Sequence, residues 1–129
     1  MTVRNSGNHV RIALNEGPPE NSCRPSVDVL FRSVASVYAS RGTVAAILTG
    51  MGNDGMRGVE ALKRRGCFCV AQSAATCVVY GMPKAIVDAG LADAIEDIET
   101  LAASLCRRFG CAAAEKVPVT GTRSGGLSP

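Results

Sequence analysis

The residue of this chain best placed to do chemistry is Asp54, which lies in a glycine-rich segment, Thr-Gly-Met-Gly-Asn-Asp-Gly, at residues 49–55. The segment directly follows an apolar run at residues 44–48, as expected for a buried strand. Parallel α/β proteins place functional groups where a strand feeds a turn that opens a helix. Two roles fit an aspartate here. It could cap the helix that starts near Gly55, or it could orient a histidine as in a Ser-His-Asp triad, with nearby backbone N–H groups forming an oxyanion hole.

The spacing from Gly50 to Gly55 also fits the dinucleotide fingerprint G-x-G-x-x-G. A dinucleotide site needs an acidic residue about 20 positions further on to bind the ribose, and residues 72–76 contain none. Asp54 would also compete with a pyrophosphate for the same donors, and no Gly-Lys-Ser/Thr of a phosphate-binding loop follows. A nucleotide-binding βαβ unit is therefore the least favoured interpretation, and we expect no cofactor.

The six cysteines are predicted to be free thiols. Four of them lie within apolar stretches, as buried thiols do, and nothing points to the oxidising compartment that a disulfide framework needs. A zinc site is disfavoured because C-x-x-C pairs are absent and the single histidine, His9, is distant in sequence. We therefore predict no metal site. The cysteines are Cys23, Cys67, Cys69, Cys77, Cys106 and Cys111.

Composition narrows the class of protein. The chain has 129 residues, which is enough for one domain or part of one, and 47% of them are hydrophobic. The formal charge of +3 is small and spread along the chain, so it predicts neither a nucleic-acid nor a membrane partner. No segment approaches the roughly 18 consecutive apolar residues of a membrane helix, and residues 1–5 lack the layout of a secretory signal. These features predict a cytoplasmic protein.

Strands and helices are predicted to alternate along the chain, which indicates an α/β fold with a parallel sheet and right-handed crossovers. So small a sheet suggests that residues 1–109 are an incomplete part of a larger domain, followed by a disordered tail at residues 110–129. Ser26 and Asp97 are the predicted N-caps of the first and last helices. Strands are expected at residues 10–14, 43–48 and 67–71, with a short one near 94–95. Helices are expected from Ser26 to near Gly42, over residues 55–65 and 83–89, and from Asp97 to residue 109. In the last helix, the residues expected to face inward are Ile98, Leu101, Leu105 and Phe109.

A basic triplet, Lys63-Arg64-Arg65, ends the helix predicted over residues 55–65. It could be a phosphate-binding patch. Cations in the last helical turn, however, also offset the helix dipole, and Gly66 is suited to the left-handed cap that ends such a helix. The second interpretation is favoured.

Three motifs follow one another along the chain: Arg-Pro-Ser-Val-Asp-Val-Leu-Phe at residues 24–31, the glycine-rich turn at residues 47–55, and Cys-Val-Val-Tyr-Gly-Met-Pro at residues 77–83. Together they resemble the C-terminal half of the chemotaxis protein-glutamate methylesterase (CheB-type) catalytic domain, in register from about residue 10 to residue 101. The resemblance implies a Rossmann-like serine hydrolase that demethylates glutamates, and can deamidate glutamines, on the cytoplasmic region of methyl-accepting chemoreceptors. It also implies that Asp54 is the triad acid and that the Met51 backbone N–H belongs to the oxyanion hole.

In the family that this chain resembles, the nucleophilic serine and the histidine belong to the N-terminal half of the domain, ahead of the matched motifs. His9 is not expected to replace that histidine, and Ser73-Ala74 stand where the family usually has an acidic pair. We therefore expect the chain to be inactive alone. The alternatives are a non-catalytic interaction module that binds receptor tails, or a half-domain that complements a separately encoded N-terminal half.

Overall fold

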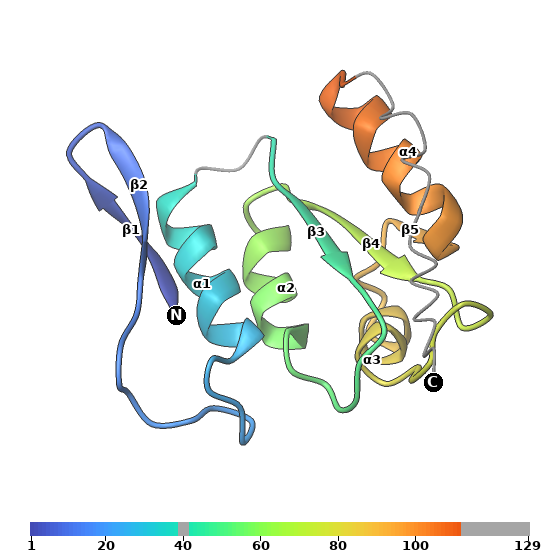
Figure 1. The fold of residues 1–129 in the computed structure, drawn as a ribbon, viewed down its shortest axis with the longest axis horizontal. Helices are drawn as coiled ribbons and strands as arrows, with labels where there is room; N and C mark the ends of the chain where they lie inside the picture. Colours follow the sequence, from blue (N-terminus) through green and yellow to red (C-terminus); the bar gives the residue numbers. More distant parts are fainter. Residues whose placement is uncertain (39–41, 112–129) are drawn as a thin grey trace, which may run out of the picture.

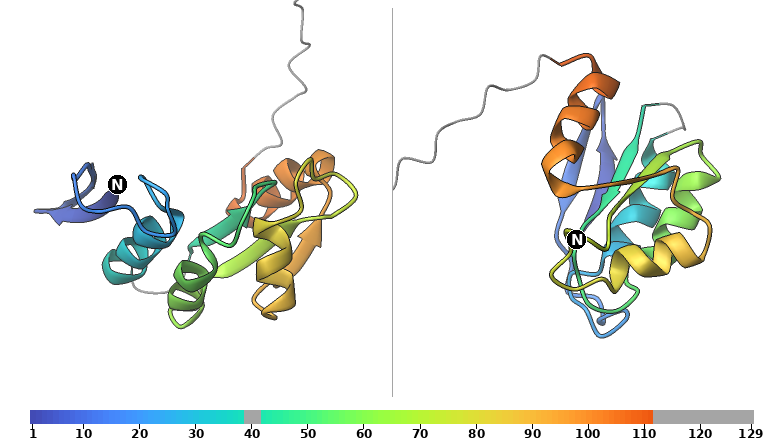
Figure 2. Two further views of the ribbon diagram at one scale, coloured as in Figure 1. Left: turned by 90° about the horizontal axis from the view of Figure 1, so that it is seen from below. Right: turned by 90° about the vertical axis from the view of Figure 1, so that its right-hand side faces the viewer.

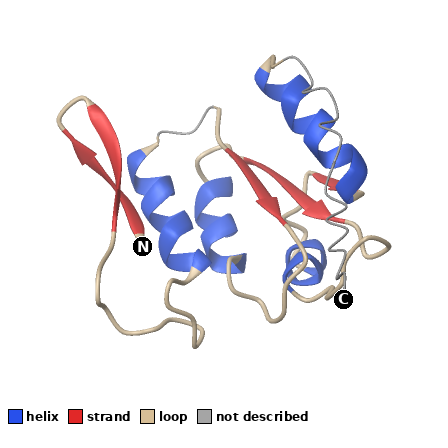
Figure 3. Ribbon diagram, in the orientation of Figure 1, coloured by secondary structure: helices blue, strands red, loops and turns tan. Residues whose placement is uncertain are grey.

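A computed structural model describes residues 1–38 and 42–111 of the chain (Figure 1). The described residues form an antiparallel two-stranded sheet, β1-β2, and a parallel three-stranded sheet of order β3-β4-β5. The predicted parallel sheet with flanking helices is thus confirmed (Figure 3). Most of the predicted tail, residues 112–129, lies outside the described residues. The elements are β1 (Thr2–Ser6), β2 (His9–Ala13), α1 (Val27–Val37), β3 (Val44–Ile47), α2 (Met56–Lys63), β4 (Phe68–Gln72), α3 (Met82–Asp88), β5 (Ala94–Glu96) and α4 (Ile98–Phe109).

The strand predicted at residues 10–14 is present as β2, but it lies in the antiparallel sheet with β1 and not in the parallel sheet. Residues 9–13 pair with Thr2–Ser6 in a hairpin, through a turn at Gly7 whose φ of 62° is the left-handed conformation that glycine adopts readily. The hairpin stands apart from the parallel sheet and packs on α1, where the Val3 N–H donates to Ser33 Oγ at 2.9 Å (Figure 1). Alternating side chains predicted an extended strand, but alternation cannot say which strand pairs with it.

The parallel sheet is built around β4. Val44 to Ile47 of β3 pair with residues 68–71, and Ala94 to Glu96 of β5 pair with residues 70–72 on the other side. Helices α2 and α3 lie on one face of the sheet and α4 on the other (Figure 2). Because both faces are covered, residues 69–72 of β4 are all at most 3% exposed, which explains the uninterrupted apolar run in the sequence.

Several predicted helix details need correction. Ser26 and Asp97 stand at the N-cap positions of α1 and α4, but neither side chain accepts a hydrogen bond from its own helix. Ser26 Oγ donates to the carboxylate of Asp54, and Asp97 Oδ1 accepts from Ser73 Oγ at 2.5 Å. In both cases the side chain forms a charge-assisted hydrogen bond between a hydroxyl and a carboxylate instead of a cap bond to its own helix.

The last and first helices also differ from their predicted patterns. Leu101 of α4 is buried as expected, whereas Ile98 and Phe109 are 41% and 55% exposed. The first helix ends at Val37 rather than near Gly42. By contrast, Gly66 has the predicted left-handed φ, 80°, after α2.

Candidate functional site

The glycine-rich turn after β3 is bound to the loop that follows β4. The Gly50 N–H donates to the Val79 carbonyl at 3.0 Å, and the Gly50 carbonyl accepts from the N–H groups of Gly81 and Met82 at 3.1 and 2.8 Å. Gly50 and Tyr80 thus form one further parallel bridge beyond the ends of the strands. These contacts fix the turn at the carboxyl edge of the sheet, where parallel α/β proteins bind their ligands.

Gly81 allows this close approach of two backbones. A Cβ at this position would lie 2.7 Å from the Gly50 carbonyl oxygen and 2.9 Å from the Gly52 nitrogen. Both neighbours are main-chain atoms that cannot rotate away. Gly52, with φ of 84°, supplies the left-handed residue that turns the chain back.

A buried glutamine at the end of β4 binds the start of the same turn. Gln72 ends β4 with 3% exposure, and its Oε1 accepts the Thr49 N–H at 2.8 Å. Its Nε2 donates to the Thr76 carbonyl at 2.8 Å. Thr49 Oγ1 in turn accepts the Val79 N–H at 2.9 Å. Sequence analysis did not assign a role to Gln72, although a lone amide at the end of a buried apolar strand is the kind of residue that needs a polar partner.

Met51 occupies the tip of the turn. Its side chain is 86% exposed. Within residues 1–38 and 42–111, its backbone N–H has no hydrogen-bond acceptor. The predicted oxyanion donor is therefore free to bind an incoming oxygen.

Asp54 is buried, with 8% exposure, and accepts four hydrogen bonds. Its Oδ1 accepts from Ser26 Oγ at 2.7 Å, from Asn21 Nδ2 at 3.0 Å and from the Asp28 N–H at 3.1 Å. Its Oδ2 accepts from the Val27 N–H at 2.7 Å. Burial alone would raise the pKa of Asp54, but these four hydrogen bonds outweigh burial and lower the pKa below its ordinary value. The carboxylate is therefore charged at neutral pH.

The expectation that Asp54 could cap its own helix is wrong. The N-cap of α2 is Gly55, with φ of 102° and no side-chain cap. Asp54 instead caps α1, since Val27 and Asp28 are the first two residues of that helix. The left-handed Gly55 turns the chain so that the carboxylate points back toward α1 rather than into α2.

Asp28 and Asn21 complete the surroundings of Asp54, and sequence analysis missed both. Asp28 is 2% exposed, and its Oδ1 accepts the Gly58 N–H of α2 at 2.6 Å. Asn21 Nδ2 donates to Asp28 Oδ2 at 2.8 Å as well as to Asp54. Gly58 lets the helices meet, because a Cβ there would lie 2.6 Å from Phe31 Cβ. The first-turn position of Asp28 was the available signal, since acidic residues there favour a helix N-terminus.

These contacts argue against a dinucleotide site. A pyrophosphate would need the N–H groups at a helix N-terminus. The Gly58 N–H of α2 is already bound by Asp28, and the Met56 N–H is bound by the Asn53 carbonyl at 3.2 Å. Two of the N–H groups at the start of α2, where the pyrophosphate would bind, are thus used within the protein.

A triad needs a histidine beside Asp54, and this chain has only one histidine, His9. His9 is exposed on β2, in the hairpin, and it is not among the partners of Asp54. Among the serines that the structure describes, Ser26 is the one whose hydroxyl donates to the carboxylate, and it does so directly rather than through an imidazole. Among the described residues, Asp54 is thus a candidate acid and the Met51 N–H a candidate oxyanion donor, with no histidine hydrogen-bonded to the carboxylate.

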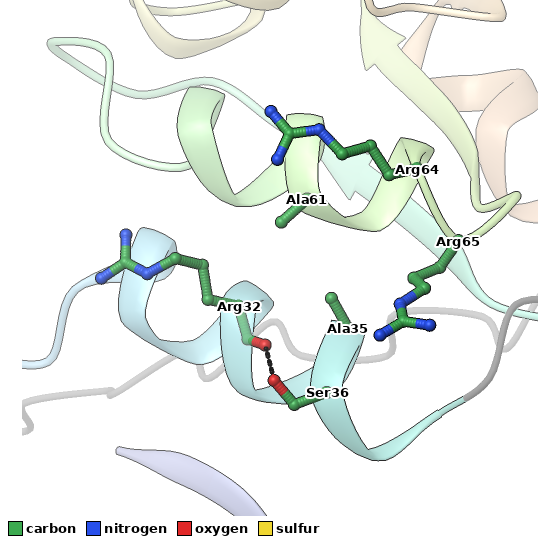
Figure 4. A pocket seen from close by; sticks show the side chains of 6 residues that line it. All are labelled: Arg32, Ala35, Ser36, Ala61, Arg64 and Arg65. Atoms are coloured by element: carbon green, nitrogen blue, oxygen red, sulfur yellow. Dashed lines mark hydrogen bonds between the residues drawn. The ribbon is translucent and has the colours of Figure 1, made fainter.

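The basic triplet lies at the far ends of α1 and α2 from Asp54. Lys63 pairs with Asp93 at 2.5 Å, as a cation in the last turn of α2. A hollow of about 460 Å³ lies between the two helices, where two alanines face each other and arginines surround them (Figure 4). Arg32 is held there by both carboxylate oxygens of Glu20, at 2.7 and 2.6 Å. The hollow is thus separate from the candidate site. Its lining residues are Arg32, Ala35, Ser36, Ala61, Arg64 and Arg65.

The cysteines are all free thiols in the structure. Cys67 and Cys69 of the central region are buried, whereas Cys23 and Cys111 are exposed. Burial raises the pKa of Cys69 to about 12 and also raises that of Cys67. In the part of the chain that the structure describes, no group of three or more histidine, cysteine or acidic side chains could hold a metal ion. Among the same residues, no helix has the length and apolar character needed to cross a membrane.

Comparison with known proteins identifies the family. Residues 1–105 match the family model described as CheB methylesterase. The chain belongs to the CheB methylesterase family. The solved CheB methylesterase catalytic domain of Thermotoga maritima superposes with a TM-score of 0.78 at 34% sequence identity, covering 82% of this chain and 56% of that one. The fold predicted from the resemblance is thereby confirmed.

Two relatives in the CheB family carry the name protein-glutamate methylesterase/protein-glutamine glutaminase. The protein of Desulfotalea psychrophila is 48% identical over 104 residues, which are 79% of this chain and 28% of that protein. The protein of Pectobacterium atrosepticum is 42% identical over 117 residues, or 91% of this chain and 33% of that protein. The chain therefore spans about a third or less of the length of these relatives.

Proposed function

We propose that this chain is the part of a chemotaxis protein-glutamate methylesterase that supplies the triad acid, Asp54, and one oxyanion-hole donor, the Met51 N–H. The observation that carries the proposal is that one turn holds both a buried, charged carboxylate and a backbone N–H that has no acceptor among the described residues. The names of the relatives supply the reaction, since those proteins are methylesterases and glutaminases acting on protein glutamate and glutamine.

The chemistry assigns each group one task. In ester hydrolysis by a triad, a serine attacks the carbonyl, a histidine takes the serine proton and then delivers it to the leaving alcohol, and the acid holds the histidine in the right tautomer. Asp54 suits the last task because it is fixed by four hydrogen bonds and stays charged. The Met51 N–H would stabilise the negative oxygen of the tetrahedral intermediate. The serine and the histidine would come from a segment outside this sequence, so the chain alone is expected to be inactive.

The partners follow from the same proposal. The substrate would be the methylated cytoplasmic region of a chemoreceptor, and the location would be the cytoplasm. An N-terminal half-domain, joined or separately encoded, would bring the nucleophile and the base to the Met51 turn.

A chimera tests the function directly. The 104 matched residues of this chain replace the equivalent segment of the Desulfotalea psychrophila relative, and methanol release from a methylated receptor fragment is measured. We expect an active chimera whose kcat falls by a factor on the order of 10³–10⁴ in Asp54→Asn. Asp88→Asn, on the exposed side of α3, is the matched control and should leave kcat unchanged. A folded chimera without activity, or one in which Asp54→Asn keeps full activity, would contradict the proposal.

A further inference from the structure

Asn21 lies at the tip of a tight turn in the segment between β2 and α1. The N–H groups of Glu20 and Cys23 each donate to the other residue's carbonyl, at 3.1 and 2.9 Å, so Asn21 and Ser22 are the two central residues of a hairpin-like turn. Their φ values are 53° and 61°. Both positions are left-handed, as such a turn requires, and asparagine tolerates this conformation better than most residues.

The turn directs the Asn21 amide between two carboxylates. Nδ2 donates to Asp28 Oδ2 at 2.8 Å and to Asp54 Oδ1 at 3.0 Å. The amide uses both of its N–H groups, and the orientation is fixed by chemistry, because charged carboxylates only accept hydrogen bonds. A donor shared between them lowers the repulsion between the two buried negative charges.

The hydrogen bonds divide unevenly between the two oxygens of Asp54. A carboxylate has about four lone-pair positions, two on each oxygen. Oδ1 receives Asn21, Ser26 and the Asp28 N–H, whereas Oδ2 receives only the Val27 N–H. Oδ2 thus has an acceptor position left, and Oδ1 has none.

We propose that Asn21 is a positioning residue that locks the Asp54 carboxylate so that Oδ2 is the oxygen presented to the imidazole N–H. The inference rests on the proposed function for the imidazole, but the locking by Asn21 is a property of this chain alone. Without the amide, Oδ1 would lose one of its three donors, and the carboxylate could rotate or bind a proton more easily.

The other charged groups facing Asp54 bear on its titration. Glu20 precedes Asn21 and Arg32 lies on α1; the two form a bidentate ion pair, so their charges largely cancel. Asp28 accepts a hydrogen bond from the same Asn21 amide, which places a second carboxylate beside Asp54. The titration of Asp54 is therefore followed at its own carboxyl carbon, which reports on this group alone.

NMR on the wild-type chain gives the first test. The side-chain carboxyl carbons are titrated with acid, together with the Asn21 Nδ2 protons. We expect the Asn21 protons to shift with the same midpoint as the Asp54 carbon. Asn21 protons that stay constant while Asp54 titrates would overturn the proposal, and this measurement needs no variant to fold.

Two glycine variants give the second test. Asn21→Gly keeps the left-handed conformation and removes the amide, while Ser22→Gly changes the adjacent left-handed residue and leaves the amide in place. We expect the pKa of Asp54 to rise by about one pH unit in Asn21→Gly and to stay constant in Ser22→Gly. An unchanged pKa in Asn21→Gly, or an equal rise in both variants, would refute the role of the amide. Because no esterase activity is measured, a failure here is distinct from a failure of the proposed function.

Discussion

The carboxylates of Asp28 and Asp54 bind N–H groups in the first turns of each other's helices. Asp54, which precedes α2, binds the first N–H groups of α1, and Asp28, which lies in the first turn of α1, binds the Gly58 N–H in the first turn of α2. Each negative charge meets the positive end of the other residue's helix. The N-terminal N–H groups of each helix are therefore bound by a carboxylate from the other segment. The candidate acid, Asp54, is held by its hydrogen bonds to the start of α1.

The first prediction concerns the contribution of Asp54 to stability. Asp54→Asn places an NH₂ group where donors now point, so the free energy of unfolding of the chain should fall by about 2–3 kcal/mol. Urea unfolding followed by circular dichroism measures the change. Asp88→Asn, whose partner Lys84 is exposed on α3, should change stability by less than about 0.5 kcal/mol. Equal effects of the two variants would show that the Asp54 hydrogen bonds are not stabilising.

The second prediction concerns pH. The folded-state pKa of Asp54 is lowered, so its contribution to stability is fully present above the unfolded-state pKa, near about 3.9, and is lost as the pH falls through the lower folded-state pKa. For Asp93, burial would raise the pKa, but hydrogen bonds from Lys63 and the Cys69 N–H lower it, so it acts in the same direction. The wild-type chain should lose stability below about pH 4. Asp54→Asn should show a shallower loss over the same pH range, and an identical slope would contradict the assignment.

The third prediction concerns the contact between the turn and the loop after β4. In Gly81→Ala the new Cβ would clash with main-chain atoms of Gly50 and Gly52, so we expect a loss of at least about 2 kcal/mol and shifted amide resonances at residues 50–52. Gly17→Ala is the control, because the nearest atom to its Cβ is the Asn15 side-chain oxygen at 3.3 Å. If Gly81→Ala is as stable as Gly17→Ala with unchanged resonances, the close approach is not required.

The fourth prediction concerns thiol reactivity. The thiolate is the reactive form, and burial keeps Cys67 and Cys69 protonated and covered. In the native chain, a thiol reagent should modify Cys23 and Cys111 rapidly and reach Cys67 and Cys69 only after unfolding, as mapped by mass spectrometry. Rapid native labelling of Cys69 would mean that β4 is not covered on both faces.

The sequence predicted the strand, turn and helix around Asp54 better than the hydrogen bonds of its carboxylate. Residues 49–55 were correctly identified as a turn between a buried strand and a helix, because apolar runs and glycines are local signals. The helix from Ser26 was predicted, but its capping by Asp54 was not, because the partners Val27 and Asp28 lie 27 and 26 residues before Asp54. Contacts over such distances depend on how two helices pack, which no local pattern contains.

Two further differences between the prediction and the structure also arise from contacts that no local pattern contains. The strand at residues 10–14 was expected in the parallel sheet, but its partner is Thr2–Ser6, and a sequence pattern does not specify a partner strand. Asn21 was missed because its role depends on two successive left-handed residues that aim its amide at Asp28 and Asp54. Asparagine and serine are common turn residues, but this local signal does not show where the Asn21 amide points.

The main chain and the side chain of Met51 have separate surroundings. The position of its N–H is set by the backbone contacts of Gly50 with Val79, Gly81 and Met82, whereas its side chain projects into solvent. Replacing that side chain would alter the surface offered to an approaching protein while leaving the donor where it is. Under the proposed function, evolution or protein engineering could therefore tune substrate preference and reaction rate independently at a single position.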